Sequence, residues 1–295
     1  MEGVTVRART RNIRGVISAL KAIKAPGKQV CLVSFDDSGL TVLWEHESKA
    51  LHSSARIAAE TFSEYSVEGS TAFGVRFGQL LDTLALFSAA LGGGEVSLEY
   101  PGPDAELVVR SVAGLDQNEA VFAHLATLEA PPSQHLEDYG QAPGSFFIAP
   151  GATLREAVED LEWAGKTATL ALTCDPPSVV LSSTEQNLSL KIDLPVDQLA
   201  GFSCQSPGLQ ASYSLKHLRT ALAQAPLQDH THGSAKVAMD AHGLMKVTHL
   251  LPLGEGRVPQ VTHPLHALQS QALAQTAAEC VLLFMVLPLE DTGPD

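Results

Sequence analysis

Apolar residues recur at steps of three and four in four segments of the chain, and this spacing predicts four amphipathic helices. The first helix is expected to follow residues 4–9 directly and to end at Pro26-Gly27, and the others are expected over about 76–91, 152–163 and 214–224. Between them, alternating or β-branched runs bounded by turn residues predict strands. The predicted strands are 4–9, 30–35, 40–45, 50–57, 64–68, 95–100, 105–112, 119–128, 145–149, 167–173, 178–183, 187–193, 197–205, 235–240, 244–251 and 278–287.

The order of these elements repeats along the chain. Ile13, Ile17 and Leu20 of the first helix correspond to Leu154, Val158 and Leu161 of the third, with a constant offset of 141. The second and fourth helices share an offset of 138, which relates Phe77, Leu80 and Leu84 to Leu215, Leu218 and Leu222. We therefore expect a duplicated α+β unit, with two helices packed on antiparallel sheet in each copy. Chance agreement between two short helical patterns is the alternative.

A change in composition separates the two copies. Residues 130–144, APPSQHLEDYGQAPG, contain three prolines and two glycines, which is typical of an extended linker. The predicted organisation is a first domain over 1–129, a connector over 130–144 and a second domain over 145–295. The stretch at about 254–277 has no counterpart in the first copy and is expected to be an insertion in a hairpin.

Composition indicates a soluble intracellular protein. Among the 295 residues, 45% are apolar, which is enough for a sizeable core. The apolar runs are too short or broken to span a bilayer, and the N-terminus shows no secretory signal pattern. The four cysteines form no CxxC pair, so we expect buried free thiols in a reducing compartment rather than disulfides or a zinc site.

The charge of the first helix opposes that of the whole chain. The formal net charge is −14, yet residues 7–28 hold seven of the nineteen Lys and Arg residues and no acid. On the predicted helix, the face opposite the apolar residues carries Arg11, Arg14, Ser18 and Lys21. A cationic face on an acidic protein predicts an anionic partner at that surface. An ordinary solvated helix face is the alternative.

The other helices differ in charge. The second opens with Arg76, and the fourth carries Lys216, His217 and Arg219 without an acid. Cations on helix faces bind DNA phosphates without reading bases, so they predict sequence-independent association. The third helix departs from this pattern, because Arg155 is outnumbered by four acids: Glu156, Glu159, Asp160 and Glu162.

Candidate catalytic chemistry is weak. The acids of the third helix could serve a metal-dependent nuclease, but their spacing also fits a solvated helix face. His230 and His232 could share a metal, yet no third ligand stands at a useful spacing. No nucleophile motif or phosphate-binding loop occurs. We therefore predict no enzyme, no cofactor and no metal.

Four stretches together resemble sliding DNA clamps of the PCNA type, and more closely the Rad-one subunits of the nine-one-one DNA-damage checkpoint clamp. They are NIRGVISALKAIK, VRFGQLLDTLALFS, LREAVEDLEWAG and TLALTCDPPSVVLSS. The resemblance implies a three-membered ring with helices around a central hole and sheets outside. It also implies a nuclear protein with Rad-nine and Hus-one type partner subunits, a clamp loader, and double-stranded DNA.

The resemblance further implies roles for particular positions. Six cations map to the hole: Arg11, Arg14, Lys21, Arg76, Lys216 and Arg219. Strands 119–128 and 187–193 would be edges that pair with neighbouring subunits. Two other functions stay open, a homotrimeric replication clamp and a metal-dependent exonuclease acting through Glu156, Glu159 and Asp160.

Overall fold

The computed structural model describes most of the chain in ten segments. These are residues 5–24, 30–90, 94–112, 121–131, 144–185, 188–206, 208–223, 233–251, 253 and 280–289. The predicted connector 130–144 lies mostly, and the predicted insertion at about 254–277 wholly, outside the described residues.

The first half contains two helices among nine strands. In chain order its elements are β1 (Val6–Thr10), α1 (Ile13–Ile23), β2 (Val30–Asp36), β3 (Gly39–Glu45), β4 (Leu51–Ala58), β5 (Glu64–Val67), β6 (Thr71–Arg76), α2 (Phe77–Ala90), β7 (Glu95–Tyr100), β8 (Leu107–Val112) and β9 (Phe122–Leu125).

The second half repeats the same order. Its elements are β10 (Ser145–Pro150), α3 (Gly151–Leu161), β11 (Thr167–Cys174), β12 (Pro177–Glu185), β13 (Leu188–Leu194), β14 (Gly201–Ser203), β15 (Leu209–Ser214), α4 (Leu215–Ala223), β16 (Ser234–Met239), β17 (Met245–Leu251) and β18 (Cys280–Val286). Each element of the first half therefore has one counterpart in the second.

Strand pairing repeats as well. In the first half β1 pairs with β5 and β7, β7 with β8, and β8 with β9. The second half shows the equivalent set, in which β10 pairs with β14 and β16, β16 with β17, and β17 with β18. The remaining strands form β6-β2-β3-β4 in one half and β15-β11-β12-β13 in the other. All of these pairs are antiparallel, so both halves contain the same folded unit.

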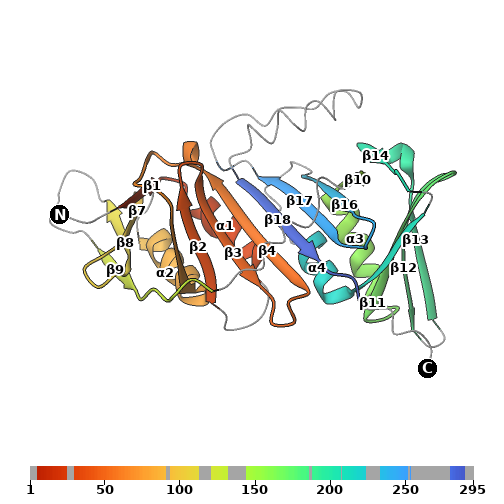
Figure 1. Ribbon diagram of the computed structural model, residues 1–295, viewed down its shortest axis with the longest axis horizontal. Helices are drawn as coiled ribbons and strands as arrows, with labels where there is room; N and C mark the ends of the chain where they lie inside the picture. The colour runs from red at the N-terminus through yellow and green to blue at the C-terminus, as the bar shows by residue number, and fades with distance from the viewer. Residues whose placement is uncertain are drawn as a thin grey trace.

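One strand pair joins the two halves. β18 lies beside β4 over the register Cys280↔Ile57 to Val286↔Leu51, which fuses strands of both halves into a nine-stranded sheet. This leaves β9 and β13 as edges of the other two sheets, at opposite ends of the molecule (Figure 1).

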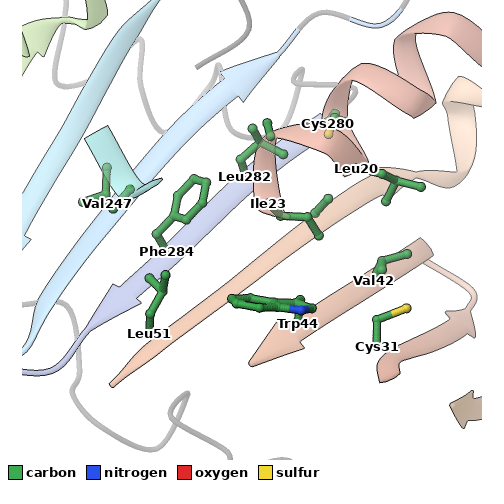
Figure 2. Packing of buried hydrophobic residues seen from close by; sticks show 14 of the residues in the cluster. Leu20, Ile23, Cys31, Val42, Trp44, Leu51, Val247, Cys280, Leu282 and Phe284 are labelled. Carbon is green, nitrogen blue, oxygen red and sulfur yellow. The ribbon is translucent and has the colours of Figure 1, made fainter. Parts of the chain in front are cut away.

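The helices cover the inner face of this continuous sheet. α1 packs against β4 and β18, and α4 packs against β18. Alternate residues of β18 are buried on that side, among them Leu282 and Phe284, together with Trp44 of β3 and Ile23 of α1 (Figure 2). Because residues of both halves belong to one hydrophobic core, the halves are held together by apolar burial as well as by the β18–β4 ladder.

Two strands were not predicted, and they occupy equivalent places. β6 precedes α2 and β15 precedes α4, where the sequences TAFGVR and LQASYS contain few large apolar residues. β6 pairs with β2, and β15 pairs with β11. These neighbouring strands stabilise a strand conformation that the composition of the two segments does not indicate. The predicted strand 197–205 was also too long, because a 3₁₀ turn at Val196–Gln198 leaves only Gly201–Ser203 as β14.

The expectation of four free thiols was wrong for two cysteines. The structure joins Cys174, at the end of β11, to Cys204, just after β14, in a disulfide. Their Cα atoms are 5.3 Å apart although 30 residues separate them in sequence. Cys31 and Cys280 are free and buried as expected, and burial raises the pKa of each thiol to about 12.

Removing this disulfide is expected to destabilise the second half. Closing a loop of this length restricts the unfolded chain and stabilises the folded one by about 3.6 kcal/mol. We expect the double variant Cys174→Ser, Cys204→Ser to lose about that much free energy of unfolding in urea titrations without reductant. Dithiothreitol should lower the stability of the wild type and leave the variant unchanged. Equal stability of the two proteins under oxidising conditions would contradict the pairing.

Candidate nucleic-acid interface

The cationic face of α1 is built by a capped amphipathic helix. Asn12 starts the helix, and its side-chain oxygen accepts a hydrogen bond from the Gly15 backbone N–H at 2.9 Å. The apolar side of α1 is buried in the core, so the opposite side is left to solvent. Arg14 and Lys21 are exposed there, and neither forms an ion pair with any residue of the described segments.

Arg11 is exposed but has a carboxylate partner. Its Nε donates to Glu95 Oε1 at 2.6 Å, and 79% of the arginine side chain is exposed. This hydrogen bond lowers the pKa of the Glu95 carboxyl. Because exposed ion pairs contribute little stability, the pair leaves Arg11 able to exchange its partner for a phosphate.

Arg7 and Arg9 lie apart from the α1 face. They alternate with buried Val6 and Ala8 along β1, so they point to the opposite, outer side of the sheet. There Arg9 pairs with Glu64 at 2.6 Å. Among the described cations of this stretch, Arg7, Arg9 and Arg11 thus pair with acids beside β1, whereas Arg14 and Lys21 are exposed on α1. Lys28 lies outside the described residues.

The second helix adds one cation. Arg76, the last residue of β6, is exposed at the start of α2 and makes no ion pair within the part of the chain that the structure describes. The exposed side of α2 otherwise carries Gln79, Asp82 and Leu86. α2 packs beside α1, so Arg76 extends the same helical layer.

In the second half, α4 presents Lys216 and Arg219 to solvent. Arg219 Nη1 donates to Glu162 Oε1, beyond the end of α3, at 2.9 Å. Lys166 is a further exposed cation that sequence reasoning missed. Its carbonyl oxygen accepts from the Leu215 backbone N–H at 2.8 Å, which places it beside the start of α4. A lysine in a turn carries no periodic signal, so only the tertiary structure identifies it.

The acids of the α3 segment are all exposed. Solvent surrounds these side chains, as expected for the exposed face of a helix: Glu156, Glu159, Asp160 and Glu162. Across the described segments, no group of three His, Cys, Asp or Glu side chains is arranged to hold a metal ion. The geometry therefore gives no support to a nuclease centre on α3. His230 and His232 lie outside the described residues.

His217 does not contribute to the cationic surface, because it is buried against the other half. Its ring meets that of His46, which follows β3, with centroids 4.8 Å apart. The Ser48 backbone N–H donates to His46 Nδ1 at 3.1 Å, so this nitrogen is unprotonated. Burial lowers the pKa of both imidazole rings, and the positive charge of nearby Lys216 lowers it further. The carboxylate of Glu47 raises the pKa of His46 by a smaller amount. Burial also lowers the pKa of His249.

These histidines predict a loss of stability in mild acid. In the unfolded chain each has an ordinary pKa near 6.5, above its folded value, so unfolding takes up protons below about pH 6.5. The histidine contribution is complete above that pH and is lost as the pH falls toward the folded pKa values. We expect urea midpoints to fall between pH 7 and pH 5. The variant His46→Gln, His217→Gln should show a shallower fall, and an identical pH dependence would contradict the assignment.

The edge strands β9 and β13 expose apolar side chains. Val121 and Phe122 are 53% and 52% exposed at β9, and Leu188 is 51% exposed at β13. Arg110 of the neighbouring β8 lies over the Phe122 ring, 5.2 Å from its centroid. Arginine and aromatic residues are enriched where protein interfaces are strongest, and open strand edges pair readily.

Known proteins share this architecture. The chain resembles the PCNA of Thermococcus kodakaraensis (TM-score 0.68, 14% identity, 97% of this chain and 100% of that chain covered). It also resembles a chain of the PCNA2–PCNA3 complex of Sulfolobus tokodaii (TM-score 0.67, 15% identity, 96% and 98% covered). A third is the Proliferating Cellular Nuclear Antigen of Entamoeba histolytica (TM-score 0.66, 16% identity, 97% and 100% covered). The fold is therefore the α+β clamp fold.

The family comparison is more specific. No curated protein matches the chain. No helix in the described segments is long and apolar enough to cross a membrane. The family model "Repair protein Rad1/Rec1/Rad17" matches residues 5–251, which includes the first repeat and the second repeat as far as β17. The chain therefore belongs to the Rad1/Rec1/Rad17 family of repair proteins.

Proposed function

We propose that this chain is a non-catalytic subunit of a heterotrimeric DNA sliding clamp that acts in the nucleus in DNA-damage checkpoint signalling and repair. Its partners are two other clamp subunits, of the Rad-nine and Hus-one types, and a clamp loader places the ring on double-stranded DNA. Family membership and the clamp fold support this proposal. The single observation that carries it is the repetition of strand pairing between the halves.

This repetition supports a proposal for the surfaces that would join subunits. Within the chain, β18 of the second half pairs with β4 of the first. The counterpart of β18 in the repeat is β9, and the counterpart of β4 is β13. Both are free edges at opposite ends of the molecule (Figure 1). If neighbouring subunits join as the two halves do, β9 of one pairs with the β13 equivalent of the next. Such head-to-tail contacts close into rings.

The repeat also predicts the register of that contact. Leu283 of β18 lies opposite Ser54 of β4. Leu283 of β18 pairs with Thr248 of β17. In the first half the equivalent pair is Phe122 of β9 with Arg110 of β8, so Phe122 corresponds to Leu283. On the other edge, Lys191 of β13 corresponds to Ser54 of β4. In a pair of identical chains, the Phe122 ring would then lie between Arg110 and Lys191, two cations on one face. Lys191 pairs with Asp193 at 3.1 Å, so the charges at this contact do not by themselves distinguish a homotrimer from a heterotrimer.

The helical layer supplies the DNA-facing surface of the proposed ring. Arg14, Lys21, Arg76 and Lys216 are exposed on it without ion pairs among the described residues. Arg219 adds a cation held in an exchangeable exposed pair, whereas Arg11, which was predicted to face the hole, precedes α1 and pairs with Glu95 near Arg9. Such contacts to phosphates are sequence-independent and weaken with salt, which suits a protein that moves along a duplex.

Co-purification tests the assembly. The chain alone is expected to elute as a monomer, and with Rad-nine and Hus-one type subunits it is expected to form a 1:1:1 complex visible as a closed ring by electron microscopy. A stable homotrimer of the chain alone would support the replication-clamp alternative. Absence of any complex with either partner would contradict the proposal.

A further inference from the structure

One helix face is buried on α1 and exposed on α3. On α1 it is formed by four positions at steps of three, four and three: Asn12, Gly15, Ala19 and Ala22. The offset of 141 between the repeats gives the matching positions of the α3 segment: Thr153, Glu156, Asp160 and Trp163. Three of the four are buried on α1, whereas all four are exposed on the α3 segment, Trp163 to 85%. We call the exposed set the open face of α3.

The second half of the molecule covers this face on α1. Each helix packs on its neighbouring helix and on strands of its own half, and α1 packs in addition against β18 of the other half. At the start of α1, the Asn12 side-chain amide also donates to the carbonyl oxygen of buried Leu253. The repeat counterpart of β18 is β9, which lies at the far end of the molecule from α3 (Figure 1). Among the described residues of one chain, α3 therefore lacks the strand that covers α1.

The subunit that pairs with β13 would supply the missing strand. In the proposed ring, its counterpart of β9 lies beside β13 as β18 lies beside β4. We propose that the open face of α3 docks on a cationic surface of this neighbouring subunit and that the charge match helps to select it. The inference rests on the proposed function, because it requires a clamp subunit next to β13.

Two carboxylates give the open face its charge. Glu156 and Asp160 stand where α1 has Gly15 and Ala19, two small residues that let the other half of the chain approach closely. Carboxylates cannot be covered in that way, because a charge removed from water is costly unless a partner charge or hydrogen-bond donors meet it. A cationic neighbour meets this requirement, and an apolar one does not.

Acids outnumber cations around the open face. The charged residues of the α3 segment and of the chain beside its end are Arg155, Glu156, Glu159, Asp160, Glu162, Lys166, Glu185 and Arg219. Among these cations, Arg219 already pairs with Glu162 at 2.9 Å. The excess of negative charge favours a basic partner surface, and it makes the contact sensitive to salt.

A second copy of this chain matches the open face less well. The helix that packs on β9 is α2, whose one charged residue is Asp82, and Arg76 precedes it. The acid and the cation offset each other, so the two carboxylates of the open face gain no net attraction. A neighbour with more basic residues on the equivalent helix fits better, and such a difference discriminates between partners.

Charge reversal on the open face provides the test. The test variant is Glu156→Lys with Asp160→Lys. Its control, Glu159→Lys with Glu162→Lys, changes the charge of the α3 segment equally on the adjoining face. Isothermal titration calorimetry measures the affinity of each chain for the Rad-nine and Hus-one type subunits separately, at low and at high salt. We expect the test variant to bind one partner at least about tenfold more weakly at low salt, with a smaller difference from the wild type at high salt. The control should bind both partners like the wild type.

The partner that is lost must be the one at β13. Leu188→Glu, on the β13 edge, identifies that partner independently of the charge variants. If Leu188→Glu releases a partner that the test variant binds like the wild type, the inference fails and the clamp proposal stands. Loss of the other partner, an equal loss in the control, or self-association of the chain that the test variant abolishes would also overturn the inference. If the wild type binds neither subunit, the clamp proposal fails as well.

Discussion

Reversing the charge of Arg14 and Lys21 is expected to cause the largest loss of DNA binding of any pair of surface substitutions. Both side chains are exposed on α1 and have no carboxylate partner among the described residues, so their full charge is available to phosphates. In the assembled ring, Arg14→Glu with Lys21→Glu should lower the slope of log K against log salt by about two, one for each lost contact. We expect binding to duplex DNA to weaken at least about 100-fold at low salt.

A matched control reverses two lysines on the other face of the sheet. Lys236 and Lys246 alternate with buried Val237 and Val247, which places them on the side away from the helices. Lys236→Glu with Lys246→Glu changes the net charge equally, so any general effect of added negative charge appears in both variants. Equal losses in the two variants would contradict a DNA-facing helical layer. A two-domain scaffold without a nucleic-acid role predicts instead that reversing Arg14 and Lys21 leaves loading onto DNA unchanged.

Replacing Phe122 by glutamate is expected to open the ring. Phe122 is 52% exposed on the β9 edge and stacks under Arg110, the combination of residue types that carries most binding energy at interfaces. A glutamate at this position would lose the apolar contact. We expect the binding free energy of that interface to fall by about 2 kcal/mol or more, which weakens the affinity at least about 30-fold. Size-exclusion chromatography and electron microscopy check this prediction. We expect them to show linear assemblies of subunits instead of closed rings.

The opposite edge supplies the complementary variant. Leu188→Glu should break the β13 interface and retain the β9 interface, so each single variant still binds one partner. The combination of both changes is expected to leave the chain monomeric in the presence of both partners. Leu86→Glu, at an exposed leucine on α2, controls for the effect of a new surface charge. Closed rings formed by the Phe122→Glu variant would contradict the proposed interface.

Periodicity in the sequence was sufficient to predict the four helices and the duplication. Apolar spacing on α1 and α3 identified the buried faces correctly, because a helix on a sheet must bury one stripe of residues wherever its neighbours come from. The same spacing predicted which residues of α1 are exposed, including Arg14 and Lys21. Exposure on α3 was equally predictable, since its acids occupy the face opposite Leu154 and Val158.

Contacts between distant segments required the tertiary structure. β6 and β15 are strands because β2 and β11 pair with them, and their own residues carry little β signal. Arg11 was predicted on the face of the first helix, yet it precedes α1 and pairs with Glu95 of β7, whose carboxyl also interacts with Arg9. Cys174 meets Cys204, and the Lys166 carbonyl accepts from the Leu215 N–H, only because the second half folds as it does.

Local sequence thus determined the helices, their buried faces and the repeated unit, since these depend on the short-range geometry of a single element. Tertiary structure decided which elements meet. The β18–β4 ladder joins the halves and thereby leaves β9 and β13 open, and the packing of α4 beside α3 brings Arg219 to Glu162. Strand partners and helix neighbours depend on burial summed over the whole core, which no local pattern encodes.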